Sequence, residues 1–280
     1  LFNVKGPGGT TASYRGGVLR YGSRNSAGPV QAAIHRSGED IVAEAWGPGS
    51  DHELDLAPRL LGLDDDPTAF NPPPGPIAQL ARRDRGLRLG STGRVFEVLA
   101  PSVLGQRVTI EEAKRDYRSL LRAYGEQAPG PPGLTLPLQP EVIAALGYED
   151  FHRHGIERSR AQILREVARR AQRLEEIVSM GREAAYQRLQ AVRGIGAWTA
   201  AHVMGIAWGD RDAVPIGDFH LPNTVAWLLA GEPRGTDDRM LELLEPYRPY
   251  RRRAVLLMKR AGAGAPKYGP KVAANDIRGK

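Results

Sequence analysis

The sequence predicts an α+β protein in which a small, antiparallel β-rich N-terminal domain precedes a mostly α-helical region of two lobes. Three observations support this fold class. Residues 1–50 are rich in Gly, Ser and Thr and carry short β-like stretches, residues 64–76 are dense in Pro and Asp, and helical apolar spacing begins near residue 77. We therefore expect domains at 1–76 and 77–262, followed by a basic tail at 263–280.

Composition narrows the class of protein. The 280 residues suit about two domains. Lys and Arg number 39 against 32 Asp and Glu, a net charge of +7 that favours a polyanionic partner such as nucleic acid. The absence of cysteine excludes disulfides and cysteine-ligated iron–sulfur clusters. No apolar run approaches ~18 residues and no secretory signal is visible, so we expect a cytoplasmic protein without a membrane partner.

The elements of the first half follow from turn and capping signals. VQAAIHR and IVAEAWG flank the turn residues 37–40 and predict a hairpin. Residues 53–63 predict a helix, and residues 64–76 predict a loop or linker. Thr109, with Glu112 three residues later, predicts a capping box, and the helix that follows should end at Gly125.

The second half is predicted to be helical after a Pro-rich loop at 128–140. Apolar residues between 161 and 174 form one face of a long predicted helix, and we expect most arginines of its other face to be solvated. Further helices are predicted near 182–191, 197–208, 221–230, 237–246 and 250–260. The two lobes could arise if 77–110 and 200–260 pack together around 111–190.

The stretch VRGIGAWTAAHVMGIAW (192–208) contains a sharp break between two predicted helices. Gly194 and Gly196 permit backbone conformations with positive φ and leave room for close approach, while Ile195 can anchor the turn in the core. The amides of the glycines and of the next helix would form an anion site suited to one phosphate. A simple turn between helices, without a ligand, is the alternative.

A carboxylate follows in DAVPIGDFHLP (212–222), where Asp218 comes directly after Gly217 and before a predicted helix. Asp is an ordinary residue at a helix start, so a capping role is one interpretation. An acid beside a phosphate-binding loop is electrostatically disfavoured and would need a chemical purpose, which is the other interpretation.

VRGIGAWTA followed by VPIGDFHLP resembles the helix–hairpin–helix DNA glycosylase superfamily, and most closely the bacterial 3-methyladenine DNA glycosylase II family. Four further segments agree in order: FEVLAPSVLGQRVTIEEAKRDYRSLLRAYG, LTLPLQPEVIAALG, GIERSRAQILREVARRA and EPYRPYRRRAVLL. The resemblance covers most of 85–260. It implies a helix–hairpin–helix glycosylase core that acts, as a monomer in the bacterial nucleoid, on double-stranded DNA containing damaged bases.

The resemblance implies that Asp218 is the catalytic residue, which stabilises the cationic sugar or orients the attacking water as the N-glycosidic bond breaks. Members with lyase activity carry a lysine at the position of Trp198, so Trp198 implies a monofunctional glycosylase of alkylated bases that leaves an abasic site. A non-catalytic DNA-binding module, or a glycosylase for bulky or non-alkyl lesions, are the alternatives.

For the hairpin, the resemblance implies that Gly194 and Gly196 contact the DNA backbone. No cofactor is required, although backbone carbonyls of this loop could hold a monovalent or divalent cation against a phosphate. By position these are the carbonyls of Gln190, Val192 and Ile195.

For the base pocket, the resemblance implies that Trp198 stacks on the extruded base, although it could equally fill the core. His202 stands where the family has a Tyr, and Lys259 stands where it has a second Trp. These departures put the preference for a cationic base in doubt, because that preference depends on aromatic rings.

The remaining DNA contacts implied are polar. In the LGQ motif and the residue after it, Gln106 would contact DNA and Arg107 would take the position of the apolar wedge. Arg251 and Arg252, in RPYRRR, would contact phosphate. His152, His154 and His220 lack metal-ligand spacing, so we expect no zinc site.

Overall fold

The computed structural model describes residues 11–266 and 277–278. Predictions for residues 1–10 and for most of the tail from 263 onward lie outside this range. The N-terminal domain holds a four-stranded antiparallel sheet in the order β1-β2-β3-β4. The strands are β1 (Ala12–Arg15), β2 (Val18–Asn25), β3 (Gly28–Ser37) and β4 (Asp40–Trp46). The predicted hairpin is confirmed: Ser37 pairs with Asp40, and Gly38 supplies the positive φ of the turn.

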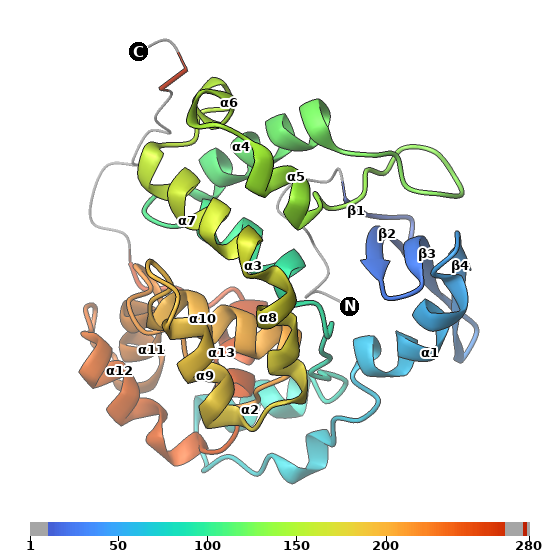
Figure 1. Ribbon diagram of the computed structural model, residues 1–280. Coiled ribbons are helices and arrows are strands. Elements are labelled where there is room, and N and C mark those ends of the chain that lie inside the picture. Colours follow the sequence, from blue (N-terminus) through green and yellow to red (C-terminus); the bar gives the residue numbers. More distant parts are fainter. Residues whose placement is uncertain (1–10, 267–276, 279–280) are drawn as a thin grey trace.

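One face of the sheet packs on helix α1 (Ser50–Leu61), which corresponds to the helix predicted at 53–63. Leu19, Tyr21 and Ile34 from alternating strand positions form a small core with Leu60 of α1. The sheet and α1 stand beside the helical region in Figure 1. The antiparallel β-rich N-terminal domain is therefore confirmed.

Helices make up the rest of the described chain. The first set is α2 (Pro76–Arg83), α3 (Val95–Leu104), α4 (Ile110–Tyr124), α5 (Pro140–Ala145), α6 (Tyr148–Arg153), α7 (Arg158–Arg169) and α8 (Ala171–Glu175). The second set is α9 (Arg182–Gln190), α10 (Ala197–Val203), α11 (Leu221–Ala230), α12 (Asp237–Leu244) and α13 (Arg251–Arg260). Short helical turns lie at η2 (Pro67–Ala69), η3 (Glu176–Ser179), η4 (Met204–Trp208) and η5 (Glu245–Tyr247). The N-cap of the predicted capping box is confirmed, because the Thr109 hydroxyl accepts the Glu112 N–H at 3.2 Å. The reciprocal bond from the Thr109 N–H to the Glu112 side chain stays a prediction.

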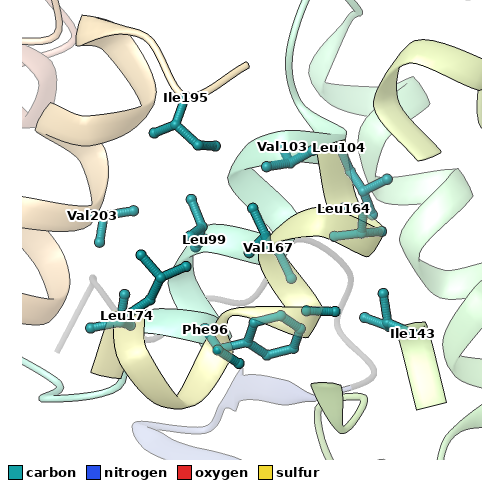
Figure 2. Packing of buried hydrophobic residues seen from close by; sticks show 14 of the residues in the cluster. Phe96, Leu99, Val103, Leu104, Ile143, Leu164, Val167, Leu174, Ile195 and Val203 are labelled. Atoms are coloured by element: carbon teal, nitrogen blue, oxygen red, sulfur yellow. The ribbon is translucent and has the colours of Figure 1, made fainter. Parts of the chain in front are cut away.

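The helical region has two hydrophobic cores. The larger core surrounds α3, whose apolar side chains lie between α7 and α10 in Figure 2. The smaller core joins α2, α11, α12 and α13. The two lobes are therefore present. The predicted packing of 77–110 on 200–260 is found for α2 with α13 and for α3 with α10 and η4, but α3, α10 and η4 belong to the larger core rather than to the lobe of α13. The reason is that α3 is apolar around most of its surface and is buried among several helices.

Two predicted helices differ from expectation. The long helix across 161–174 is interrupted at Arg170, whose backbone (φ −105°, ψ 7°) departs from helical values. The helix predicted over 197–208 is α-helical only to Val203 and continues as the π-helical turn η4, which ends at Gly209 with a positive φ. Such π turns are uncommon and often lie at functional sites.

A buried polar network joins the N-terminal domain to α3. Glu53 of α1 accepts hydrogen bonds from Tyr21 of β2, at 2.7 Å, and from Arg94. Glu97 of α3 accepts from the Ser23 hydroxyl at 2.8 Å. Burial raises the pKa of Glu97 despite the opposing charge of Arg94.

The segment predicted as a linker at 64–76 is anchored to the helical region. Asp65 is buried and accepts hydrogen bonds from the Leu89 N–H at 2.9 Å and from Arg253. Phe70 packs into the smaller core. Within the described ranges, no helix has both the length and the apolar character needed to cross a membrane.

Candidate active site

Three loops and the end of α13 meet around Trp198. The indole Nε1 of Trp198 donates a hydrogen bond to Oδ2 of Asp218 at 3.1 Å. A Cβ placed on Gly105 would lie 3.9 Å from the far edge of the same ring. The loop after α3, the hairpin before α10 and the loop before α11 are thus brought to one place, although they are far apart in sequence.

The hairpin depends on one of its two glycines. Gly194 has φ +92°, and a Cβ there would lie 2.5 Å from Ile163. Gly196 has φ −86° and open space at its Cβ position. Only Gly194 is therefore required by backbone conformation. Ile195 is buried, as predicted, and both glycines are exposed.

Gln106 holds the hairpin from within the protein. Its amide nitrogen donates to the Gly194 carbonyl at 3.0 Å and to the Thr199 hydroxyl at 2.9 Å. Both hydrogen bonds of this nitrogen are made to groups of the protein, so the Gln106 side chain positions the hairpin loop. A DNA contact through its remaining oxygen stays a prediction.

Arg107 is exposed at the end of the same loop. With φ +59°, it is the one non-glycine residue with positive φ among the described residues. A bulky residue in this conformation is strained, and such strain clusters at functional positions. Its predicted role as a wedge is untested.

Arg160 is a positioning residue that the sequence did not reveal, because we expected its helix face to be solvated. It is buried and donates to the carbonyl of Leu104 at 3.0 Å, just before the loop that carries Arg107. It also lies 3.4 Å from a carboxylate oxygen of Asp116. Its position four residues before Leu164, on the buried face of α7, was the available signal.

Both carboxylate oxygens of Asp218 accept hydrogen bonds, one set at the start of α11 and the other from Trp198. Its Oδ1 accepts the N–H groups of His220 at 3.0 Å and Leu221 at 2.9 Å, where α11 begins. Its other oxygen faces Trp198. Burial alone would raise the pKa of Asp218, but these hydrogen bonds and the charge of Lys259 outweigh burial and lower it. The carboxylate is therefore ionised at neutral pH.

His202 and Lys259 border this carboxylate. The His202 ring lies 4.3 Å from the Trp198 ring, centroid to centroid, and is tilted by 37°. Burial, with the nearby charge of Lys259, lowers the pKa of His202 to about 4, so the ring is neutral at pH 7. Lys259 has an exposed side chain, yet desolvation by surrounding protein lowers the pKa of its ammonium.

The predicted phosphate contacts of Arg251 and Arg252 are wrong, because both side chains are buried, each 7% exposed. Arg251 makes a bidentate ion pair with Asp212, at 2.9 and 2.6 Å. Arg252 occupies the space left by Gly205, where a Cβ would lie 2.4 Å from its Nε. The side chains of Arg251 and Arg252 are thus buried where α13 packs on the rest of the protein, and they are not accessible to a ligand.

The carbonyls considered for a cation belong to a tight turn. That of Val192 accepts the Ile195 N–H at 3.0 Å, and a carbonyl oxygen retains a second lone pair for a cation. The carbonyls of Gln190 and Ile195 lie at either end of the same turn, and carbonyl oxygens are ligands that a hard cation accepts, so a cation here stays a prediction. Among the described residues, no group of three His, Cys, Asp or Glu side chains could hold a metal ion.

Phe219 was also missed by the sequence interpretation. It follows Asp218 directly and is 83% exposed, with only an edge contact to His220 at 4.8 Å. An aromatic ring left this open beside an ionised carboxylate is typical of a surface that contacts a partner. The signal was an aromatic residue inside a predicted loop.

A glycine hairpin between two helices, joined to a carboxylate on the next loop and set between two helical cores, defines a helix–hairpin–helix protein. The chain belongs to the HhH-GPD superfamily of base excision DNA repair proteins, whose family model matches residues 100–249. The resemblance and the fold class inferred from the sequence are therefore confirmed.

Curated relatives carry DNA glycosylase names, and solved structures of DNA glycosylases share the fold. DNA-3-methyladenine glycosylase 2 of Escherichia coli (strain K12) is 27% identical over 196 residues, which cover 69% of this chain and 66% of that protein. The curated relatives are matched over 58–66% of their own length. The 3-methyladenine DNA-glycosylase from Archaeoglobus fulgidus has a TM-score of 0.77 at 22% identity, over 94% of this chain and 93% of that one. An 8-oxoguanine glycosylase/lyase of Clostridium acetobutylicum in complex with double-stranded DNA has a TM-score of 0.64 at 13% identity. The match covers 90% of this chain and 98% of that one.

Proposed function

We propose that this protein is a DNA glycosylase that hydrolyses the N-glycosidic bond of a damaged, alkylated base in double-stranded DNA. One observation carries the proposal: the half-buried, ionised carboxylate of Asp218 is fixed by the Trp198 indole and two backbone amides beside an exposed glycine hairpin. A residue that served only as a helix cap would not need its second oxygen fixed by a side chain from another helix.

The chemistry follows from a fixed negative charge. An alkylated base is a good leaving group, so the sugar gains positive charge as the bond breaks. A preorganised carboxylate beside C1′ stabilises that charge or orients the attacking water. The hairpin amides bind the strand through phosphate, which places the protein without reading sequence.

The side chains around Asp218 are compatible with an alkylated base as the substrate. The neutral ring of His202 does not repel a cationic base, and the Trp198 ring offers a stacking surface. Lys259 is the one cation that borders Asp218 in this part of the described chain, and its own pKa is lowered. A panel of methylated, deaminated, oxidised and bulky-adduct duplexes would identify the preferred lesion.

We also propose that the enzyme is monofunctional and acts as a monomer. Trp198 stands where lyase members carry an amine, and an indole cannot form a Schiff base with the sugar. Borohydride should therefore trap no covalent complex with damaged DNA. A cation at the hairpin carbonyls would add charge against one phosphate and take no part in the bond cleavage.

The test is the Asp218→Asn variant on alkylated duplex DNA. The parent protein should release free base and leave alkali-labile sites, and the variant should be slower by on the order of a hundredfold or more, because the fixed charge is gone. Its affinity for DNA should stay the same or rise, because repulsion from phosphate is removed. A variant that keeps full activity would refute the assignment of Asp218.

A non-catalytic DNA-binding module remains distinguishable by the same assay. Such a module would bind duplex DNA but release no base from any duplex of the panel. Asp218→Asn would then alter only thermal stability, through the cap of α11.

A further inference from the structure

A cavity in the N-terminal domain lies apart from the site described above. It has a volume of about 340 Å³ and is bordered by β1, β2 and β3 and by the loop that carries Gly133 and Leu134. Its polar lining residues are Ser13, Arg15, Arg20 and Gln31. Cavities of this size are in the range that holds small ligands.

The loop over the cavity is held in place by backbone contacts. Gln127 and Thr135 form a bridge across the base of this loop. A Cβ on Gly22 would lie 3.2 Å from the Thr135 carbonyl, so the loop packs directly on the sheet there. Gly22 pairs with Gln31 in the sheet, so the loop residues that pack on Gly22 lie next to Gln31.

Gln31 is the unusual residue of this cavity. It is 0% exposed, and neither its amide nitrogen nor its amide oxygen has a hydrogen-bond partner. Buried polar groups are almost always paired, so an unpaired donor and acceptor together call for an explanation. An adjacent donor and acceptor form the edge that pairs with a nucleobase, as glutamine does with adenine.

Arg15 and Arg20 add positive charge at the border. Both are exposed, and neither guanidinium makes a hydrogen bond or an ion pair with the described residues. Arg24, on the same sheet, pairs instead with Glu126 at 2.9 Å. Two unpaired guanidinium groups beside one cavity suit a phosphate.

We propose that this cavity binds one nucleotide, with the phosphate on Arg15 and Arg20 and the base edge on Gln31. Val18 and Leu134 supply apolar walls for a flat base. Because Gln31 is 0% exposed, the proposal requires the residues over its amide to move when the base binds. The nucleotide could be free or could be the end of a DNA strand. This proposal does not depend on the glycosylase activity.

The experiment is isothermal titration calorimetry of the full chain with the four deoxynucleoside 5′-monophosphates, their nucleosides and inorganic phosphate. A monophosphate should bind with one-to-one stoichiometry, and its nucleoside and phosphate alone should each bind about tenfold more weakly or worse, because each lacks half of the contacts. No binding of any monophosphate would overturn the proposal.

Variants locate the binding. Arg15→Gln with Arg20→Gln should weaken monophosphate binding about tenfold, whereas Arg36→Gln, on the same sheet but outside the cavity lining, should not. Gln31→Leu should reduce binding to the level of phosphate alone while the melting temperature holds or rises, because an unpaired buried amide is removed. Equal binding by the double arginine variant and the parent would overturn the proposal. This arm holds even where Gln31→Leu fails to fold, because Arg15 and Arg20 are exposed.

Two further measurements distinguish a free nucleotide from a DNA strand end, and the cavity from the proposed active site. A short 5′-phosphorylated single strand should bind more tightly than the monophosphate where a strand end is the ligand, and no more tightly where a free nucleotide is. Both results support the cavity, provided that the double arginine variant loses the same binding. The Asp218→Asn variant should bind the monophosphate as the parent does. A changed affinity in that variant, weaker or tighter, would place the nucleotide in the proposed active site and overturn the proposal.

Discussion

At the scale of single residues, Trp198 joins two roles that the sequence left open as alternatives. Its ring is half-buried against the loop after α3, and its N–H is committed to Asp218. His202 covers one side of the ring at 4.3 Å. The residue thus contributes to packing and to the electrostatics of the carboxylate, and its stacking on a base stays a prediction.

Trp198→Phe should separate the hydrogen bond from the aromatic surface. The indole N–H favours the ionised form of Asp218, so its removal should raise the pKa of that carboxyl. The acid limb of the base-release profile should then move to higher pH, with a loss of rate at neutral pH of about tenfold or less. The measurement is the pH dependence of single-turnover base release.

The matched control is Trp208→Phe. The Trp208 N–H donates to the Met180 carbonyl at 3.1 Å, within the larger core and without a contact to Asp218. Its loss should leave the acid limb in place. An acid limb that does not move in Trp198→Phe would show that this hydrogen bond does not set the ionisation of Asp218.

At the scale of elements, the hairpin shows that two similar glycines have different reasons to be there. Gly194 takes a positive φ in close contact with Ile163, and its carbonyl is held by Gln106. Gly196 has an ordinary extended conformation with open space around it. The turn itself therefore does not require glycine at position 196, and a role of Gly196 in close approach to DNA stays a prediction.

Gly194→Ala should destabilise the protein by roughly 1–3 kcal/mol, because alanine is strained at this φ and its Cβ collides with Ile163. Gly196→Ala should change stability by less than about 1 kcal/mol. Urea denaturation measures both values. If Gly196 approaches DNA closely, its variant should lose duplex affinity while it keeps stability, and equal stabilities of the two variants would contradict the assignment of the strain to Gly194.

At the scale of the whole molecule, the N-terminal domain and the helical core are joined by buried charges rather than by apolar contact alone. Arg94 pairs with Glu53 of α1, and both are almost fully buried. Glu175 of α8 accepts the N–H groups of Val95 and Phe96 at 2.8 Å, where α3 begins. The start of α3 is therefore held from both sides, and α3 carries the loop of Gln106 and Arg107 into the site.

Arg94→Ala should destabilise the protein by ~3–5 kcal/mol, because it leaves the carboxylate of Glu53 buried without its cation. The control is Arg153→Ala, whose ion pair with Asp150 is on the surface and should contribute at most about 1 kcal/mol. Guanidinium denaturation followed by tryptophan fluorescence measures both. Similar losses in the two variants would mean that the buried pair does not join the domains.

The hairpin, the capped helix at Thr109, the glycine turn and the candidate carboxylate could be predicted from sequence, because each depends on residues within a few positions of one another. Which charged side chains are exposed and which are buried depends instead on contacts between distant segments. Arg160, Arg251 and Arg252 look alike in sequence to exposed arginines. In the structure Arg160 donates to the Leu104 carbonyl, Arg251 pairs with Asp212, and Arg252 is buried against Gly205. A polar side chain's role depends on those partners, and long-range packing alone brings them together.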